Sequence, residues 1–115
     1  MVFNPEQALN FWKNAALTQV LDNDPDLSVR QTAILLTVYL EPPPHTVRGL
    51  AQQLDVTKPV ITRALDSMGE KKLISRRRDE RDRRNVLIQR TVQGALYLER
   101  LADLIIEQAS QVTTR

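Results

Sequence analysis

The residues best suited to chemistry in this sequence are the arginines between positions 76 and 84. Six of these nine residues are arginine, and the other three are Asp79, Glu80 and Asp82. Guanidinium groups at this density repel one another, and phosphate groups relieve that repulsion. The interleaved carboxylates are placed to hold and aim individual guanidinium groups. The segment is therefore predicted to contact a polyanion. A solvated hairpin whose charges neutralise one another is the alternative.

A second group of polar residues precedes the arginines and fits the outer face of one helix. The apolar residues of this segment follow the i, i+3, i+4, i+7 spacing of a buried helical stripe: Ile61, Ala64, Leu65 and Met68. The residues left facing outward are Thr57, Lys58, Thr62, Arg63, Asp66 and Ser67. Arginine can donate two hydrogen bonds to guanine, and threonine can touch a thymine methyl group. Lys58, near the start of the helix, suits a phosphate. These residue types favour a face that reads the major groove of DNA.

The sequence contains few of the residues that catalysis requires. The sequence has no cysteine and one histidine, His45, and its three glycines are widely separated. A metal ion requires several converging ligands, and a phosphate loop requires clustered glycines. A thiol-based redox switch is excluded as well. We therefore predict a protein that is not an enzyme, with no catalytic residues, no cofactor and no metal.

Charge is distributed unevenly along these 115 residues, although the net charge is only +2. Residues 1–45 carry two basic and five acidic side chains, whereas residues 46–90 carry twelve basic and six acidic ones. A basic middle between mildly acidic ends is typical of a nucleic-acid contact surface on a neutral scaffold. No apolar run approaches the roughly 18 residues needed to cross a bilayer. No secretion signal is visible, so we expect a cytoplasmic protein without a membrane partner.

The elements that must position these residues are mostly helical. Asn4 and Ser28 each precede a glutamine by three residues, the capping-box pattern that opens a helix. Alternation at Val86–Gln89 predicts a strand paired with the arginine segment. The expected helices run from Asn4 to about Leu21, Ser28 to about Leu40, Thr46 to Leu54, Lys58 to about Lys71 with Thr57 as its cap, and Thr91 to about Ala109. The expected strands are Leu73–Arg78 and Asn85–Gln89.

The third and fourth helices have the spacing of a helix-turn-helix. The residues that fit its corner are Leu50, Ala51, Leu54, Val56, Ile61 and Ala64. The turn between them needs a residue that tolerates positive φ, which Asp55 does. An ordinary helical hairpin with a polar outer face is the alternative. We predict a mainly α fold with a small β-hairpin wing, an α+β winged helix-turn-helix. It forms one domain over residues 1–115, with a lobe at 28–91 between terminal helices at 4–21 and 92–110.

From Thr46 to Gly94 the sequence resembles the MarR family of winged-helix transcriptional regulators. The matching segments are Leu50–Leu54, Val60–Asp66, Lys71, Leu73–Ile74 and Arg81–Arg84, followed by Thr91 and Gly94. The most specific element is Asp82-x-Arg84, whose arginine in the family enters the minor groove while the aspartate fixes it. The resemblance implies a regulator, most often a repressor, that binds duplex DNA. The residues that we predict to contact DNA are Thr57, Lys58, Thr62, Arg63, Ser67, Arg76, Arg78, Arg81, Asp82, Arg83 and Arg84.

The sequence departs from the family pattern at four points. Asp55 and Lys72 stand where the family has glycines, and Arg90 stands where it has a leucine. The sequence also stops about one helix short of the family's usual length, in the region that builds the dimer and a ligand pocket. A small lipophilic anion as effector is implied by the resemblance alone, with Phe11, Trp12, Arg30, Leu36 and Tyr39 as lining residues that fit a core equally well.

The terminal helices carry apolar residues in more directions than one buried face requires. In the last helix these residues are Leu96, Leu98, Leu101, Ala102, Leu104, Ile105, Ile106 and Ala109. A homodimer interface is the interpretation we favour, and a monomer that buries both helices is the alternative. The competing function is a protein-interaction module whose basic wing docks on an acidic partner.

Overall fold

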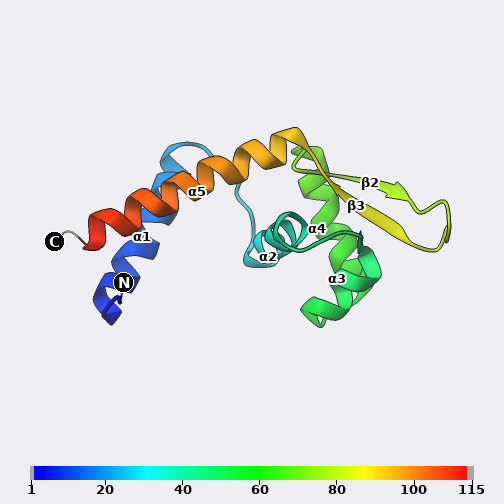
Figure 1. The fold of residues 1–115 in the computed structure, drawn as a ribbon, viewed down its shortest axis with the longest axis horizontal. Coiled ribbons are helices and arrows are strands. Elements are labelled where there is room, and N and C mark those ends of the chain that lie inside the picture. Colours follow the sequence, from blue (N-terminus) through cyan, green and yellow to red (C-terminus); the bar gives the residue numbers. More distant parts are fainter. Residues whose placement is uncertain (1, 114–115) are drawn as a thin grey trace. The chain divides into compact units, whose positions relative to one another are not determined.

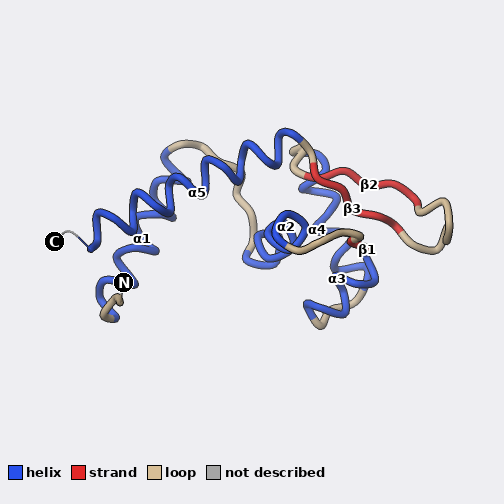
Figure 2. Tube along the Cα trace, in the orientation of Figure 1, coloured by secondary structure: helices blue, strands red, loops and turns tan. Residues whose placement is uncertain are grey.

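The structure is a computed structural model that describes residues 2–113. It contains five helices and three short strands in those residues (Figure 1). The elements are α1 (Pro5–Leu21), α2 (Val29–Leu40), β1 (His45–Thr46), α3 (Val47–Leu54), α4 (Lys58–Glu70), β2 (Ile74–Arg78), β3 (Val86–Arg90) and α5 (Val92–Thr113). Figure 2 shows the same path with the three strands gathered beside α3 and α4. The fold is therefore a winged helix, as predicted.

The chain divides into two compact units, each described by itself. The winged unit comprises Leu27–Tyr97, and the terminal unit comprises the residues up to Asp26 together with those from Leu98 onward. Helix α5 contributes its first turns to the winged unit and the rest to the terminal unit. Within residues 2–113 no helix has both the length and the apolar character that a membrane span requires.

Side-chain caps set the starts of α1, α2 and α3 as predicted. The Asn4 side chain accepts a hydrogen bond from the Gln7 backbone (2.8 Å), and the Gln7 side chain accepts one from the Asn4 backbone (2.9 Å). Ser28 and Gln31 form the same capping box at α2. The Thr46 hydroxyl accepts from the Gly49 backbone at the start of α3. Each such cap stabilises its helix by about 1 kcal/mol.

The predicted cap at Thr57 was wrong in one respect, because its hydroxyl makes no capping hydrogen bond. Its backbone has the cap conformation, with φ −81° and ψ 159°. The second helical position is Pro59, which has no N–H to donate. The next N–H, that of Val60, bonds to the Thr57 carbonyl oxygen instead (3.1 Å). Helix α4 thus begins where expected while leaving the Thr57 hydroxyl free of the helix.

The core of the winged unit joins α2, α4 and the sheet. Ile34, Leu35 and Val38 of α2 are fully or almost fully buried, as are Ile61, Leu65 and Met68 of the predicted α4 stripe. Helix α4 contacts both α2 and α3, and β2 lies against it. Ile74 and Ile88 close the core from the sheet. The polar side of α4 is left facing away from this core.

The sheet has three strands in the order β1-β3-β2, all antiparallel. Strands β2 and β3 form the predicted hairpin, with Arg77 paired to Leu87, although both strands begin one residue later than expected. Strand β1 was not predicted as part of the fold. It has only two residues, with His45 paired to Ile88, and it follows three prolines, so it has too few residues for a periodic pattern.

Three helices end with a non-glycine residue in the left-handed conformation, at Asn23, Asp55 and Lys72. Asp55 has φ 55° and ψ 49°, which confirms the prediction that it turns the helix-turn-helix. At Lys72 the backbone N–H bonds to the Gly69 carbonyl oxygen and the Leu73 N–H to that of Met68, both at 3.0 Å. This pair of bonds is a Schellman motif, which glycine normally closes.

The Tyr39 hydroxyl joins α2 to both ends of the hairpin. It donates to the Leu73 carbonyl oxygen (2.9 Å) and accepts from the Thr91 backbone N–H (2.9 Å). The Thr91 hydroxyl in turn donates to the Lys72 carbonyl oxygen (2.7 Å) and accepts from the Gly94 N–H (2.9 Å). A Cβ atom at Gly94 would overlap the Tyr39 hydroxyl and the Leu73 carbonyl oxygen. The start of β2 and the end of β3 are thereby both fixed to one side chain.

Arg90 holds the same corner from the side. Its Nε donates to the Val38 carbonyl oxygen (3.0 Å) and its terminal nitrogen to that of Glu41 (3.3 Å), while its guanidinium lies 5.8 Å from the centre of the Tyr39 ring. A cation at the carboxyl end of a helix satisfies carbonyls that have no partner within the helix. The arginine that replaces the family's leucine therefore caps α2.

The Lys72→Gly variant tests the backbone strain at the end of α4. We expect its free energy of unfolding to rise by roughly 1 kcal/mol, because a side chain in the left-handed conformation costs about that much. Urea unfolding followed by circular dichroism measures the change. Lys71→Gly is the matched control, since Lys71 has φ −82° and glycine there should lower stability. Equal destabilisation by both glycines would contradict the account.

Candidate nucleic-acid interface

The exposed face of α4 carries the polar residues that the sequence placed there. Thr57, Lys58, Thr62 and Arg63 are all exposed, because the buried stripe on the other side of the helix packs into the core. Neither Lys58 nor Arg63 has an ion-pair partner among residues 2–113. Their charges are therefore available to an outside anion.

Ser67 differs from the other four. Its side chain is half-buried, and its hydroxyl lies 3.0 Å from the Lys71 ammonium nitrogen, which donates to it. Part of the hydrogen-bonding capacity of Ser67 is thus used within α4, one turn along. Its predicted contact with DNA remains a prediction.

At the wing tip, the Asp82 carboxylate accepts three hydrogen bonds from Arg84. Arg84 Nε and a terminal nitrogen donate to the two carboxylate oxygens at 3.0 and 3.2 Å, and the Arg84 backbone N–H donates at 3.1 Å. The Arg84 side chain is nevertheless 81% exposed, while that of Asp82 is 34% exposed. A bidentate pair fixes the direction of a guanidinium group as well as its position. Arg84 is thus aimed without being covered.

The same contacts set the ionisation of Asp82. Hydrogen bonds from the side chain and the backbone of Arg84 hold the pKa of the Asp82 carboxyl below its usual value, and the charge of Arg48 acts in the same direction. A lowered pKa means that the carboxylate is favoured in the folded state, and this preference is lost as the pH falls through that pKa. The pair therefore persists at neutral pH.

The remaining arginines of the tip divide into two kinds. Arg78 donates to the Arg83 carbonyl oxygen at 2.6 Å, so its guanidinium helps to close the hairpin. The side chains of Arg81 and Arg83 are exposed and have no ion-pair partner in the part of the chain that the structure describes. The Asp79 side chain accepts from the Arg81 backbone N–H (2.9 Å), which shapes the turn while leaving the Arg81 guanidinium free of that aspartate.

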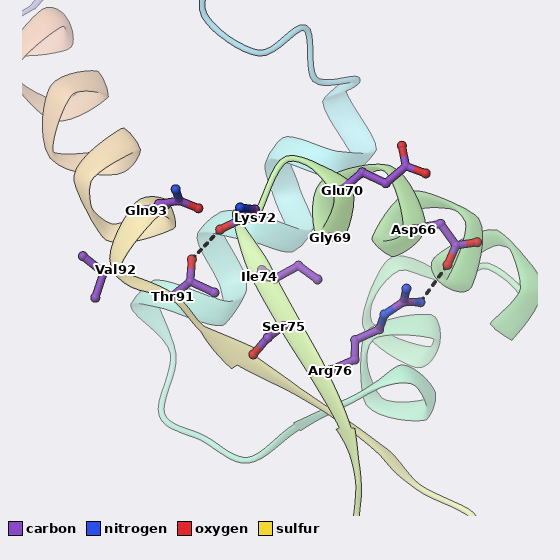
Figure 3. Close-up of a pocket in the computed structure, with 10 residues that line it drawn as sticks. All are labelled: Asp66, Gly69, Glu70, Lys72, Ile74, Ser75, Arg76, Thr91, Val92 and Gln93. Atoms are coloured by element: carbon purple, nitrogen blue, oxygen red, sulfur yellow. Dashed lines mark hydrogen bonds and ion pairs between the residues drawn. The ribbon is translucent and has the colours of Figure 1, made fainter.

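Arg76, which was predicted to contact DNA with the other wing arginines, already has a partner within the protein, and its contact with DNA stays a prediction. Its guanidinium forms an ion pair with Asp66 of α4 at 2.8 Å (Figure 3). Both side chains are among the residues that line a groove of about 940 Å³. The groove is lined by Asp66, Gly69, Glu70, Lys72, Ile74, Ser75, Arg76, Thr91, Val92 and Gln93.

One exposed cation that acts on the wing tip, Arg48, was missed in the sequence. Arg48 lies on α3, and its charge acts on Asp82, which places it within electrostatic reach of the wing tip. Its position on the polar side of the third helix was the available signal. Arg77 alternates with Arg76 and Arg78 along β2 and so belongs to the opposite face of the strand. Within residues 2–113 no cluster of side chains could hold a metal ion.

Comparison with known proteins gives consistent matches. The MarR family model matches residues 26–85. An organic hydroperoxide resistance transcriptional regulator of Bacillus subtilis (strain 168) is 39% identical over 59 residues, which is 51% of this chain and 40% of that protein. The chain therefore aligns with less than half the length of that curated relative.

Solved structures share the fold over most of the chain. The S. aureus MepR–DNA complex matches with a TM-score of 0.73 and 25% identity, covering 90% of this chain and 84% of that one. A transcriptional regulator from Thermotoga maritima matches with a TM-score of 0.75 and 20% identity, covering 95% of this chain and 74% of that one. With the family model matching more than half of its residues, the chain belongs to the MarR family of winged-helix transcriptional regulators.

Proposed function

We propose that this protein binds duplex DNA in the cytoplasm as a homodimer and regulates transcription as a repressor. The observation that carries the proposal is the Asp82–Arg84 pair, which presents an aimed, exposed guanidinium at the tip of the wing. The unpaired Lys58 and Arg63 on the outer face of α4 support it. The match to MepR, which was solved in complex with DNA, supports it from outside the chain.

In this proposal α4 and the wing divide the work of recognition. Arg63 donates to a guanine edge in the major groove, Thr62 contacts a neighbouring base or phosphate, and Lys58 binds a phosphate. Arg84 enters the minor groove, where a narrow A·T-rich stretch has an enhanced negative potential that attracts arginine. Arg81 and Arg83 contact the flanking phosphates. The α4 residues thus provide direct base readout, and the wing provides shape readout and affinity.

The terminal unit supports the homodimer. Eight of its large apolar residues are exposed: Val2, Leu9, Trp12, Leu17, Val20, Leu21, Ile105 and Ile106. An apolar surface of this kind marks an interface with another protein. A two-fold dimer would place two α4 helices in successive major grooves about one helical turn apart. Relief of repression by a small lipophilic anion completes the proposal and rests on the family alone.

The Arg84→Ala variant tests the role of the wing. We expect the affinity for duplex DNA to fall about tenfold, and the slope of log K against log salt concentration to become shallower by about 0.9, because one fewer counterion is released. Fluorescence anisotropy between 50 and 200 mM salt would measure both. Arg100→Ala, in the terminal unit, is the control for the lost charge. Undiminished binding by Arg84→Ala would disprove the wing contact.

The Asp82→Asn variant separates aiming from charge. Arg84 keeps its charge but loses the bidentate partner, so we expect severalfold weaker binding to a specific site with little change in the salt slope. The same anisotropy titrations give the answer. Tighter binding at every salt concentration would mean that Asp82 acts only by repelling phosphate, and the aiming role would be wrong.

The Arg63→Ala variant tests base recognition by α4. A lost bidentate contact should remove about 1–3 kcal/mol of discrimination at one base pair of the selected site and leave the other positions unchanged. Competition between site variants measures this preference. Lys58→Ala is the comparison, because losing a phosphate contact weakens binding evenly across sequences. A shallow salt slope in the unmodified protein, with no preferred sequence, would favour docking on an acidic protein instead.

A further inference from the structure

We propose that Asp66 determines specificity by keeping Arg76 away from DNA. The inference rests on the proposed DNA-binding function and assigns a role within it to an acidic residue of the recognition helix. Asp66 lies on the recognition helix, and Arg76 on the first strand of the wing. Their ion pair, at 2.8 Å, is the only one between α4 and the hairpin among residues 2–113.

The position of Asp66 puts it beside the base-reading residues. It follows Arg63 by three residues and Thr62 by four, and residues at those spacings are neighbours on one helix face. Its side chain is 57% exposed, whereas the Arg76 side chain is only 32% exposed. In Figure 3 Arg76 reaches from β2 toward α4 and meets Asp66 there. The carboxylate therefore lies on the face that carries Thr62 and Arg63.

The charge arrangement explains what such a pair does at a DNA-binding surface. A free arginine beside the recognition helix would bind any phosphate and so raise the affinity for every sequence equally. A free carboxylate there would repel every duplex. When the two groups are paired, their charges cancel. The attraction to DNA then comes from residues whose contacts depend on the base or the groove. Specificity is a ratio of affinities, so suppressing the sequence-independent contribution raises it.

Folding stability alone is a weak reason for this contact. An ion pair with this much exposure to solvent contributes little to stability, because solvent screens it and both side chains lose freedom. A purely mechanical brace between wing and helix is the competing explanation. The two explanations predict opposite changes in affinity when the carboxylate is removed, which makes them separable.

The test uses Asp66→Asn in the full chain, titrated with a random-sequence duplex and with a selected site over a series of salt concentrations. We expect the random duplex to bind severalfold more tightly at low salt, with a slope steeper by about 0.9 because Arg76 now releases a counterion. The ratio of specific to non-specific affinity should fall. Adding Arg76→Gln should return the slope to that of the unmodified protein.

Asp24→Asn is the matched control, since it makes the same change in charge and breaks the Asp24–Arg100 pair of the terminal unit (3.8 Å). It should leave the slope unchanged. Weaker binding of both duplexes by Asp66→Asn at an unchanged slope would establish the brace and overturn the inference, as would no change at all. If the unmodified protein fails to bind duplex DNA at low salt, the proposed function falls and the inference falls with it. Thermal melting confirms that each variant is folded.

Discussion

The Tyr39 hydroxyl is the contact on which the position of the wing depends. One oxygen atom bonds to the carbonyl oxygen of Leu73, just before β2, and to the backbone N–H of Thr91, just before α5. The hairpin is therefore tied at both ends to the last turn of α2, and Gly94 leaves the space that this requires. Arg90 secures the same turn by capping α2. A wing anchored in this way can present Arg84 in a constant place relative to α4.

The arginines of the winged unit differ in the partners that their guanidinium groups have. Arg78 and Arg90 donate to backbone carbonyl groups and stabilise the fold, and Arg76 is neutralised by Asp66. Arg63 and Arg84 remain exposed, the latter held in direction by Asp82. A count of basic residues alone would overestimate the charge offered to DNA. What matters is which guanidinium groups already have a partner.

Much of the fold could be predicted because it depends on local rules. The caps at Asn4 and Ser28, the α4 stripe and the turn at Asp55 each follow from spacing within a few residues. Strand β1 could not, since it exists only through pairing with β3. The partners of Arg76 and Arg90 likewise depend on residues that lie far away in the sequence and fold beside them. In the candidate site, sequence therefore predicted which residues are exposed better than which ones are free to bind.

In the proposed complex, α4 and the wing of two chains contact one duplex together. Selection of bound DNA from a random pool, followed by sizing of the complex, measures the symmetry of the site and the number of chains bound to it. We expect a near-palindromic site whose half-sites lie about one helical turn apart, bound by two chains. Enrichment of no sequence, or a single chain on an asymmetric site, would contradict this proposal.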